Sequence, residues 1–128
     1  MAITIIKKRA DFLLAASSGF KFVKSSVVVQ SRKREPSYIP ESDIRIGFTA
    51  TKKLGNAVIR NRAKRRMREA AQLLITEFGI AGCDYVFIGR EPVYKGTYEN
   101  LLSDMKHALK RLGKMMMEKE EAASCKES

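Results

Sequence analysis

The sequence predicts an α+β fold in which helices pack against a four-stranded sheet. Two observations carry this prediction. Residues 57–78 place apolar side chains at intervals of three and four, which is typical of a long amphipathic helix. Residues 44–51 alternate apolar and polar side chains, which is typical of a strand with one buried face. With the weaker segments added, the element order is αβββαβα. Four strands are too few for a doubly wound domain, so we expect a two-layer sandwich.

The first part of the chain is expected to form one helix and two strands. Residues 9–16 have apolar side chains at helical spacing, and Gly19 follows as a helix stop. Aromatic and β-branched residues favour strands at 20–24 and 26–31. Residues 32–43 are polar and contain two prolines, which indicates an exposed connection to the next strand.

The second part is expected to add the long helix, a fourth strand and a final helix. Gly55 and Asn56 form a turn, and Asn56 is a favourable N-cap for the helix at 57–78. Residues 83–89 form the fourth strand, and Thr97 caps the last helix. The predicted buried stripes are Ile59, Ala63, Met67, Ala70, Leu74 and Phe78 in the first of these helices, and Leu101, Met105, Ala108, Leu112 and Met116 in the second.

Size and composition favour one domain, residues 1–128, in which the charged end at 118–128 frays. No apolar span, lipidation motif or secretory signal is recognisable, so we expect no membrane contact and a cytoplasmic protein. Cys83 and Cys125 have no metal-ligand spacing, and two lone thiols suit a reducing compartment. Cys83 is expected to be a buried strand residue.

The net charge is strongly positive, at +11 with a pI of about 9.9, which favours a polyanionic partner. Residues 52–68 hold eight basic side chains and no acid. They are Lys52, Lys53, Arg60, Arg62, Lys64, Arg65, Arg66 and Arg68. Opposite the apolar stripe of the helix lie Asn61, Lys64, Arg65 and Arg68, flanked by Arg60, Arg62 and Arg66.

Two other interpretations of this basic helix fit the pattern less well. A solvated face of no particular role ordinarily intersperses acids with lysines for i,i+4 pairing, whereas the first acid here is Glu69. A helix that reads the DNA major groove usually follows a partner helix, whereas this one follows a strand and a tight turn. The pattern therefore favours phosphate contacts with a folded RNA.

Residues 51–58 spell Thr-Lys-Lys-Leu-Gly-Asn-Ala-Val, and Arg60-Asn61-Arg62, Lys64-Arg65 and Arg68-Glu69 follow. This pattern closely resembles the signature of the bacterial ribonuclease P protein component. Similar segments surround Lys8-Arg9, Asp11-Phe12, residues 45–48 and the strand at 84–90, so the resemblance covers nearly the whole chain.

The resemblance implies a ribosomal protein S5 domain 2-like fold with a left-handed strand-helix-strand crossover, against the usual preference. It also implies the protein subunit of an endoribonuclease, a hydrolase that matures the 5′ end of tRNA. The catalytic centre would lie in a partner RNA, and Mg²⁺ would act through that RNA without a site on the protein. The partners would be this catalytic RNA and precursor tRNA, with no obligate protein partner. The protein would also lower the Mg²⁺ requirement and broaden substrate affinity.

The RNA-binding residues implied are Lys52, Lys53, Asn56, Arg60, Asn61, Arg62, Lys64, Arg65, Arg66 and Arg68. A cleft between the first helix and the sheet would take the 5′ leader through Lys8, Arg9, Phe12 and Phe22. The chain departs from the commoner family pattern at Ala16 and Gln30, where many relatives have aromatic residues. Charge is therefore expected to contribute more to leader binding than stacking does.

No catalytic site in the protein itself is indicated. His107 is the only histidine, and the carboxylates form no motif. The alternative function is a structural RNA-binding protein, such as a ribosomal component or an RNA chaperone, with no part in cleavage. Charge cannot separate these two functions, and only the signature favours the first.

Overall fold

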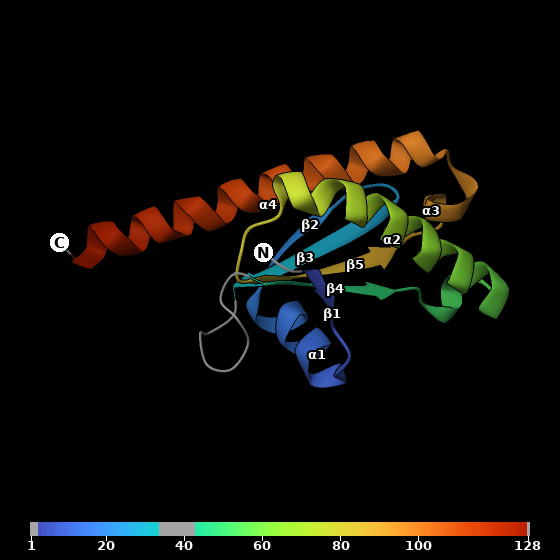
Figure 1. The fold of residues 1–128 in the computed structure, drawn as a ribbon, viewed down its shortest axis with the longest axis horizontal. Helices are drawn as coiled ribbons and strands as arrows, with labels where there is room; N and C mark the ends of the chain where they lie inside the picture. The colour runs from blue at the N-terminus through green and yellow to red at the C-terminus, as the bar shows by residue number, and fades with distance from the viewer. Residues whose placement is uncertain (1–2, 34–42, 128) are drawn as a thin grey trace.

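The computed structural model describes residues 3–33 and 43–127 (Figure 1). In chain order the elements are β1 (Ile3–Ile5), α1 (Arg9–Ser18), β2 (Phe20–Val23), β3 (Val27–Lys33), β4 (Ile44–Thr49), the 3₁₀ turn η1 (Lys52–Leu54), α2 (Ala57–Phe78), β5 (Cys83–Gly89), α3 (Pro92–Lys95) and α4 (Tyr98–Glu127). Most of the connection predicted at 32–43 lies outside the described residues. Residues 32 and 33 belong to β3.

One mixed sheet runs through the molecule, with the strands in the order β1-β4-β5-β3-β2. β4 pairs in parallel with β1 and β5, whereas β3 pairs antiparallel with β5 and β2. Since α2 connects the parallel neighbours β4 and β5, the strand-helix-strand unit expected around the basic helix is present. The predicted α+β class is confirmed.

The sheet has five strands and not the predicted four, because β1 was missed. β1 spans three exposed residues, too few to show a period-two pattern. It pairs only with β4, as in the register of Ile3 with Ile44 and Ile5 with Ile46. Its partner lies about forty positions away in the sequence, so nothing in the local pattern indicates a strand.

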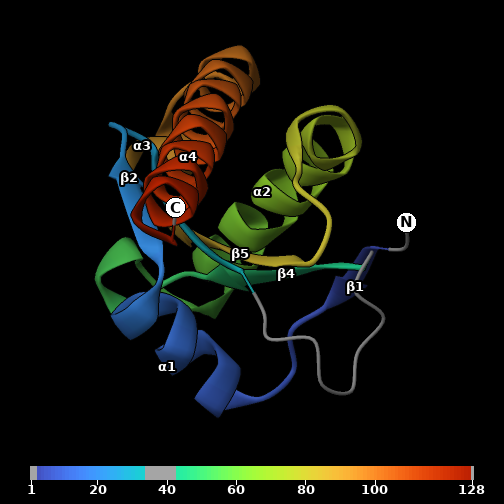
Figure 2. The same ribbon diagram turned by 90° about the vertical axis from the view of Figure 1, so that its left-hand side faces the viewer.

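Helices cover both faces of the sheet. α2 and α4 lie side by side on one face, and α1 lies alone on the other (Figures 1 and 2). The two-layer arrangement therefore describes α2 and α4 on the sheet, and α1 adds a third layer. The central strand β5 is buried on both sides, since Tyr85 and Phe87 belong to the core beneath α2 and α4 while Val86 packs in a second cluster with Ala15 of α1.

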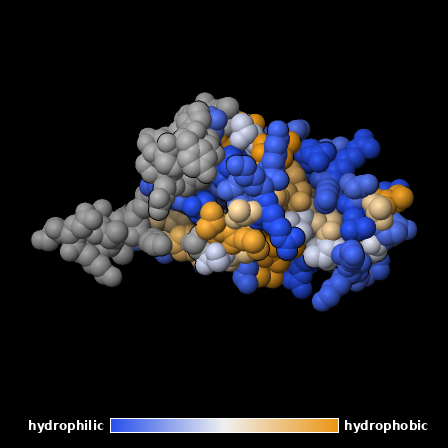
Figure 3. Space-filling view, turned by 90° about the horizontal axis from the view of Figure 1, so that it is seen from below, coloured by the Kyte–Doolittle hydropathy of each residue, from blue (hydrophilic) through white to orange (hydrophobic). Residues whose placement is uncertain are grey.

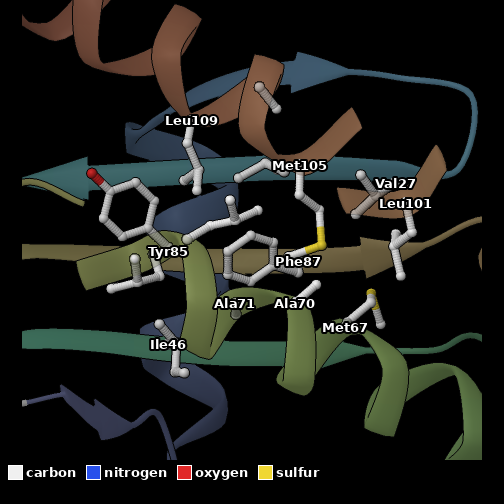
Figure 4. Close-up of a cluster of buried hydrophobic side chains, with 14 of the residues drawn as sticks. Val27, Ile46, Met67, Ala70, Ala71, Tyr85, Phe87, Leu101, Met105 and Leu109 are labelled. Carbon is white, nitrogen blue, oxygen red and sulfur yellow. The ribbon is translucent and has the colours of Figure 1, made fainter. Parts of the chain in front are cut away.

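The main core lies between the sheet and the pair of helices α2 and α4 (Figure 4). Both predicted stripes contribute to it, with Ile59 and Phe78 at the ends of the α2 stripe only partly buried. Side chains of β5 such as Phe87 meet Met67 and Ala70 from α2 and Met105 from α4 (Figure 4). Cys83 is buried in β5, as predicted.

Both predicted N-caps are confirmed. The Asn56 side-chain oxygen accepts a hydrogen bond from the Ile59 backbone N–H at 3.0 Å. The Thr97 hydroxyl accepts one from the Asn100 backbone N–H at 3.1 Å. α4 is longer than expected, because its backbone continues as a helix through the segment predicted to fray and ends at Glu127.

Candidate nucleic-acid interface

The start of α2 is fixed by the turn that precedes it. Leu54 in η1 is buried, and Gly55 has a φ of +145°, a backbone conformation that side chains rarely adopt. A Cβ at Gly55 would also lie 2.9 Å from the Ile59 side chain. The neighbouring Lys52 and Lys53 are exposed beside the helix start. Asn56, predicted to bind RNA, uses its side-chain oxygen to accept the capping hydrogen bond described above.

The outward side of α2 carries what we call the α2 basic face: Asn61, Arg62, Lys64, Arg65 and Arg68. All are exposed except Lys64, which is half-buried. Arg65 forms an exposed i,i+4 ion pair with Glu69 at 3.5 Å, which contributes little because solvent screens it. The Arg68 guanidinium lies 5.9 Å from the centre of the Phe48 ring. These side chains are therefore held loosely and can reach an anionic partner.

Arg60 and Arg66 differ from the α2 basic face. The Arg66 guanidinium donates hydrogen bonds to the backbone carbonyls of Val93 and Gly96, at 3.2 and 2.9 Å. It thereby ties α2 to the segment around α3, which is a structural role that no feature of the sequence indicated. Arg60 is half-buried, and its Nε is buried without a hydrogen-bond partner.

A second basic surface lies on the opposite side of the sheet. A shallow pocket of about 360 Å³ is lined by Lys7, Arg9, Phe12, Leu13 and Thr49, and we call it the α1 pocket. The Phe12 ring packs directly over Gly47, where a Cβ would lie 2.6 Å from a ring carbon. Lys8, at the N-cap position of α1, is exposed nearby. Figure 3 views this side and shows apolar surface near the middle, with hydrophilic surface toward the end where α2 begins.

The four residues predicted to bind the leader do not lie together. Lys8, Arg9 and Phe12 gather at the α1 pocket, whereas Phe22 packs against the core on the α4 side of the sheet. Its ring lies 5.5 Å from the His107 ring and 6.0 Å from the Arg111 guanidinium. The expectation that Phe22 shares a cleft with Phe12 is therefore wrong.

The two departures from the family pattern are on the α1 side of the sheet. Ala16 is exposed on α1, and Gln30 on β3 is only 8% exposed and pairs with Val86 of the α1 cluster. Neither side chain offers an aromatic ring for stacking. Phe12 is the one aromatic residue that lines the α1 pocket.

A buried charged network fixes α1 against the sheet, and sequence reasoning assigned it no role. Arg45 on β4 donates from Nε and Nη2 to the two carboxylate oxygens of Asp84, at 2.8 and 2.6 Å. Its Nη1 donates to Asp11 of α1 at 3.2 Å. The hydrogen bonds with Asp84 raise the pKa of Arg45 although burial opposes the charge. The alternating pattern of residues 44–51 predicted that the Arg45 side chain points away from the main core. Nothing in the sequence identified its partners.

Among residues 3–33 and 43–127, no helix has both the length and the apolarity that crossing a membrane requires. The described side chains also contain no group of three His, Cys, Asp or Glu residues suited to a metal ion.

Known proteins resemble this chain in sequence and in fold. A family model described as Ribonuclease P matches residues 3–113. The ribonuclease P protein component of Ruegeria pomeroyi is 46% identical over 111 residues, covering 86% of this chain and 86% of that protein. The corresponding component of Paramagnetospirillum magneticum is 42% identical over 108 residues, covering 84% and 81%.

Two solved structures extend the comparison to the fold. The RNase P protein of Staphylococcus aureus superposes with a TM-score of 0.69 at 31% identity, covering 83% of this chain and 92% of that one. The RNase P protein of Thermotoga maritima gives a TM-score of 0.68 at 27% identity, covering 83% and 94%.

Proposed function

The chain belongs to the ribonuclease P protein family, and from this membership we infer that it is the RNA-binding subunit of a ribonucleoprotein that removes the 5′ leader from precursor tRNA. The catalytic centre lies in the partner RNA. The protein contributes affinity and charge, and Mg²⁺ acts through the RNA.

The α2 basic face is the observation that carries this proposal. Between Lys52 and Arg68 no acid intervenes, and the arginines on the outward side contact no described carboxylate except Glu69. Such a surface repels itself until phosphates neutralise it, and arginine binds phosphate oxygens in a bidentate manner. We assign this face to the catalytic RNA.

The α1 pocket supports the second half of the proposal. It places Phe12 between basic residues, in a hollow open to solvent, which is the combination that binds single-stranded RNA. We assign the pocket to the 5′ leader, with Lys8 and Arg9 steering the phosphates and Phe12 offering one stacking surface. Since the pocket and α2 lie on opposite faces of the sheet, the protein can contact both RNAs at once.

Neutralisation of charge explains what the subunit adds. Precursor tRNA and a catalytic RNA repel each other, and cations on both sides of one small protein offset that repulsion. The assembled complex should therefore cleave at lower Mg²⁺ and lower salt than the RNA alone. The protein alone should bind precursor weakly and cut nothing.

The test compares the parent with the triple variant Arg62→Ala, Arg65→Ala, Arg68→Ala in binding to the ribonuclease P RNA of the same organism. Each lost phosphate contact should flatten the plot of log K against log [salt] by about 0.7 to 0.9, so the slope of the triple variant should be lower by roughly 2.1 to 2.7. Folding should survive, because these side chains lie off the apolar stripe, and circular dichroism checks this.

Two results would contradict the proposal. One is an unchanged salt slope in a folded triple variant. The other is the recovery of ribosomal RNA, and no ribonuclease P RNA, with the protein purified from its own cells. The second result would favour the structural RNA-binding alternative.

A further inference from the structure

Part of α4 carries a run of cations that no acid interrupts, as the first turns of α2 do. Four cationic side chains form what we call the α4 basic face: Lys106, Lys110, Arg111 and Lys114. All four are exposed, and no Asp or Glu occurs between Met105 and Met117. The opposite side of this helix segment carries the buried Leu109 and Leu112, so the charges project away from the core.

Aromatic rings from two other elements lie near three of these four cations, at distances similar to that between Arg68 and Phe48. The ammonium groups of Lys106 and Lys110 lie 5.5 and 5.3 Å from the centre of the Phe78 ring at the end of α2. On the other flank, the Arg111 guanidinium lies 6.0 Å from the Phe22 ring of β2. Such contacts restrict the long side chains while leaving donors for a ligand, so less entropy is lost on binding.

No described carboxylate forms an ion pair within 4.0 Å with a cation of this face. Elsewhere on the surface, i,i+4 ion pairs join Arg65 to Glu69 and Lys95 to Glu91. Glu77 and Glu118 line a hollow of about 640 Å³ together with Lys110 and Lys114. Among the described side chains, however, no ion pair within 4.0 Å links these acids to the lysines.

The remaining acid near this stretch is engaged with a turn. Asp104, one residue before Met105, accepts hydrogen bonds through one oxygen from the hydroxyls of Ser25 and Ser26, at 3.1 and 2.6 Å. The same oxygen accepts a third from the Ser26 backbone N–H at 3.2 Å. Its carboxylate therefore secures the turn between β2 and β3, and no ion pair within 4.0 Å links it to the four cations of the α4 basic face.

The position of α4 indicates which partner meets this face. α4 packs beside α2 on one side of the sheet, and the α1 pocket is on the other side (Figures 1 and 2). A polyanion seated on the α2 basic face can extend along the same layer to α4, whereas a leader in the α1 pocket is separated from it by the sheet. We propose that the α4 basic face is a second surface that contacts the phosphate backbone of the catalytic RNA. This inference rests on the proposed function.

The experiment measures binding to the ribonuclease P RNA over a salt series for four folded proteins. They are the parent, Lys110→Gln/Lys114→Gln, the charge-retaining Lys110→Arg/Lys114→Arg, and the control Lys21→Gln/Lys95→Gln. The control removes the same charge from two exposed lysines, one on the α1 side of the sheet and one at the end of α3. Losing two phosphate contacts should flatten the salt slope by about 1.5 in the first variant only.

A slope in Lys110→Gln/Lys114→Gln equal to that of the control would overturn the inference, provided that the α2 triple variant still loses slope. If the α2 triple variant also keeps the parent slope, the proposed function itself fails. A loss seen with precursor tRNA but not with the catalytic RNA would likewise overturn the inference, because it would assign the face to the other partner.

Discussion

The two faces of the sheet are held together by different forces. Among the described residues, 22 buried apolar side chains form the cluster under α2 and α4, whereas three form the cluster under α1. On the α1 side, an Arg45 network with Asp84 and Asp11 supplements that small cluster. α2 therefore packs on a large apolar core, and substitutions of its exposed charged residues do not alter that core. The position of α1, and with it the α1 pocket, depends on a few buried charges.

Arg45→Ala should have a large effect on stability, because it acts on the α1 side of the sheet. It removes the cation that hydrogen-bonds to Asp11 and the nearer of the two arginines beside the fully buried Asp84, where Arg32 remains at 4.0 Å, and removing one partner of a buried pair costs about 3 kcal/mol or more. We expect a loss of about 3 kcal/mol in the free energy of unfolding, measured by urea denaturation. The matched control is Arg62→Ala on the exposed face, which should change stability by less than about 0.5 kcal/mol. A loss below about 1 kcal/mol for Arg45→Ala would mean that the small apolar cluster holds α1 by itself.

The next largest effect concerns the two kinds of arginine within α2. Arg66→Ala removes two hydrogen bonds to the carbonyls of Val93 and Gly96 and should cost about 1.5 to 3 kcal/mol of stability. Because that guanidinium is already engaged, the salt slope of RNA binding should stay at the parent value. Arg65→Ala is the control and should show the reverse. Its free energy of unfolding should be unchanged, and its salt slope of RNA binding should be lower. If Arg66→Ala lowers the salt slope of RNA binding as much as Arg65→Ala does, Arg66 also contacts the RNA.

The smallest expected effect tests charge against stacking in the α1 pocket. Lys8→Ala with Arg9→Ala should lower the preference for precursor over mature tRNA roughly fivefold, since two exposed charge contacts together are worth about 1 kcal/mol. Phe12→Leu should lower it less, because neither Ala16 nor Gln30 supplies a second ring. Both ratios are measured in the assembled complex. A larger loss from Phe12→Leu at unchanged stability would show that one ring suffices for stacking.

Features that depend on neighbouring residues were predictable from the sequence. The caps at Asn56 and Thr97 and the stripes of α2 and α4 follow from local spacing, and the structure confirms them. The α2 basic face was equally visible, because helical periodicity alone separates it from the buried stripe.

Features that depend on which strands become neighbours were not predictable. Asp84 lies beside Arg45 in the parallel pairing of β4 and β5, and beside Arg32 in the antiparallel pairing of β3 and β5. For the same reason β1 was not predicted as a strand, since its partner β4 is distant in the chain. The wrong prediction that Phe22 lies in the leader cleft has the same cause. Alternation shows that Phe20 and Phe22 point to one side of the strand but not which helix covers that side.

The position of β5 also constrains the order in which the chain can fold. β5 lies between β3 and β4, both of which precede it in the sequence, so the sheet stays in two pieces until residue 89 is available. The β2–β3 hairpin is local and can form early, while the pairing of β5 with β3 spans more than fifty residues and closes a long loop. During synthesis, the whole of α2 emerges after β4 but before β5, the second of the two strands on which its apolar stripe packs. The most basic segment of the protein is therefore made before the sheet that positions it can close.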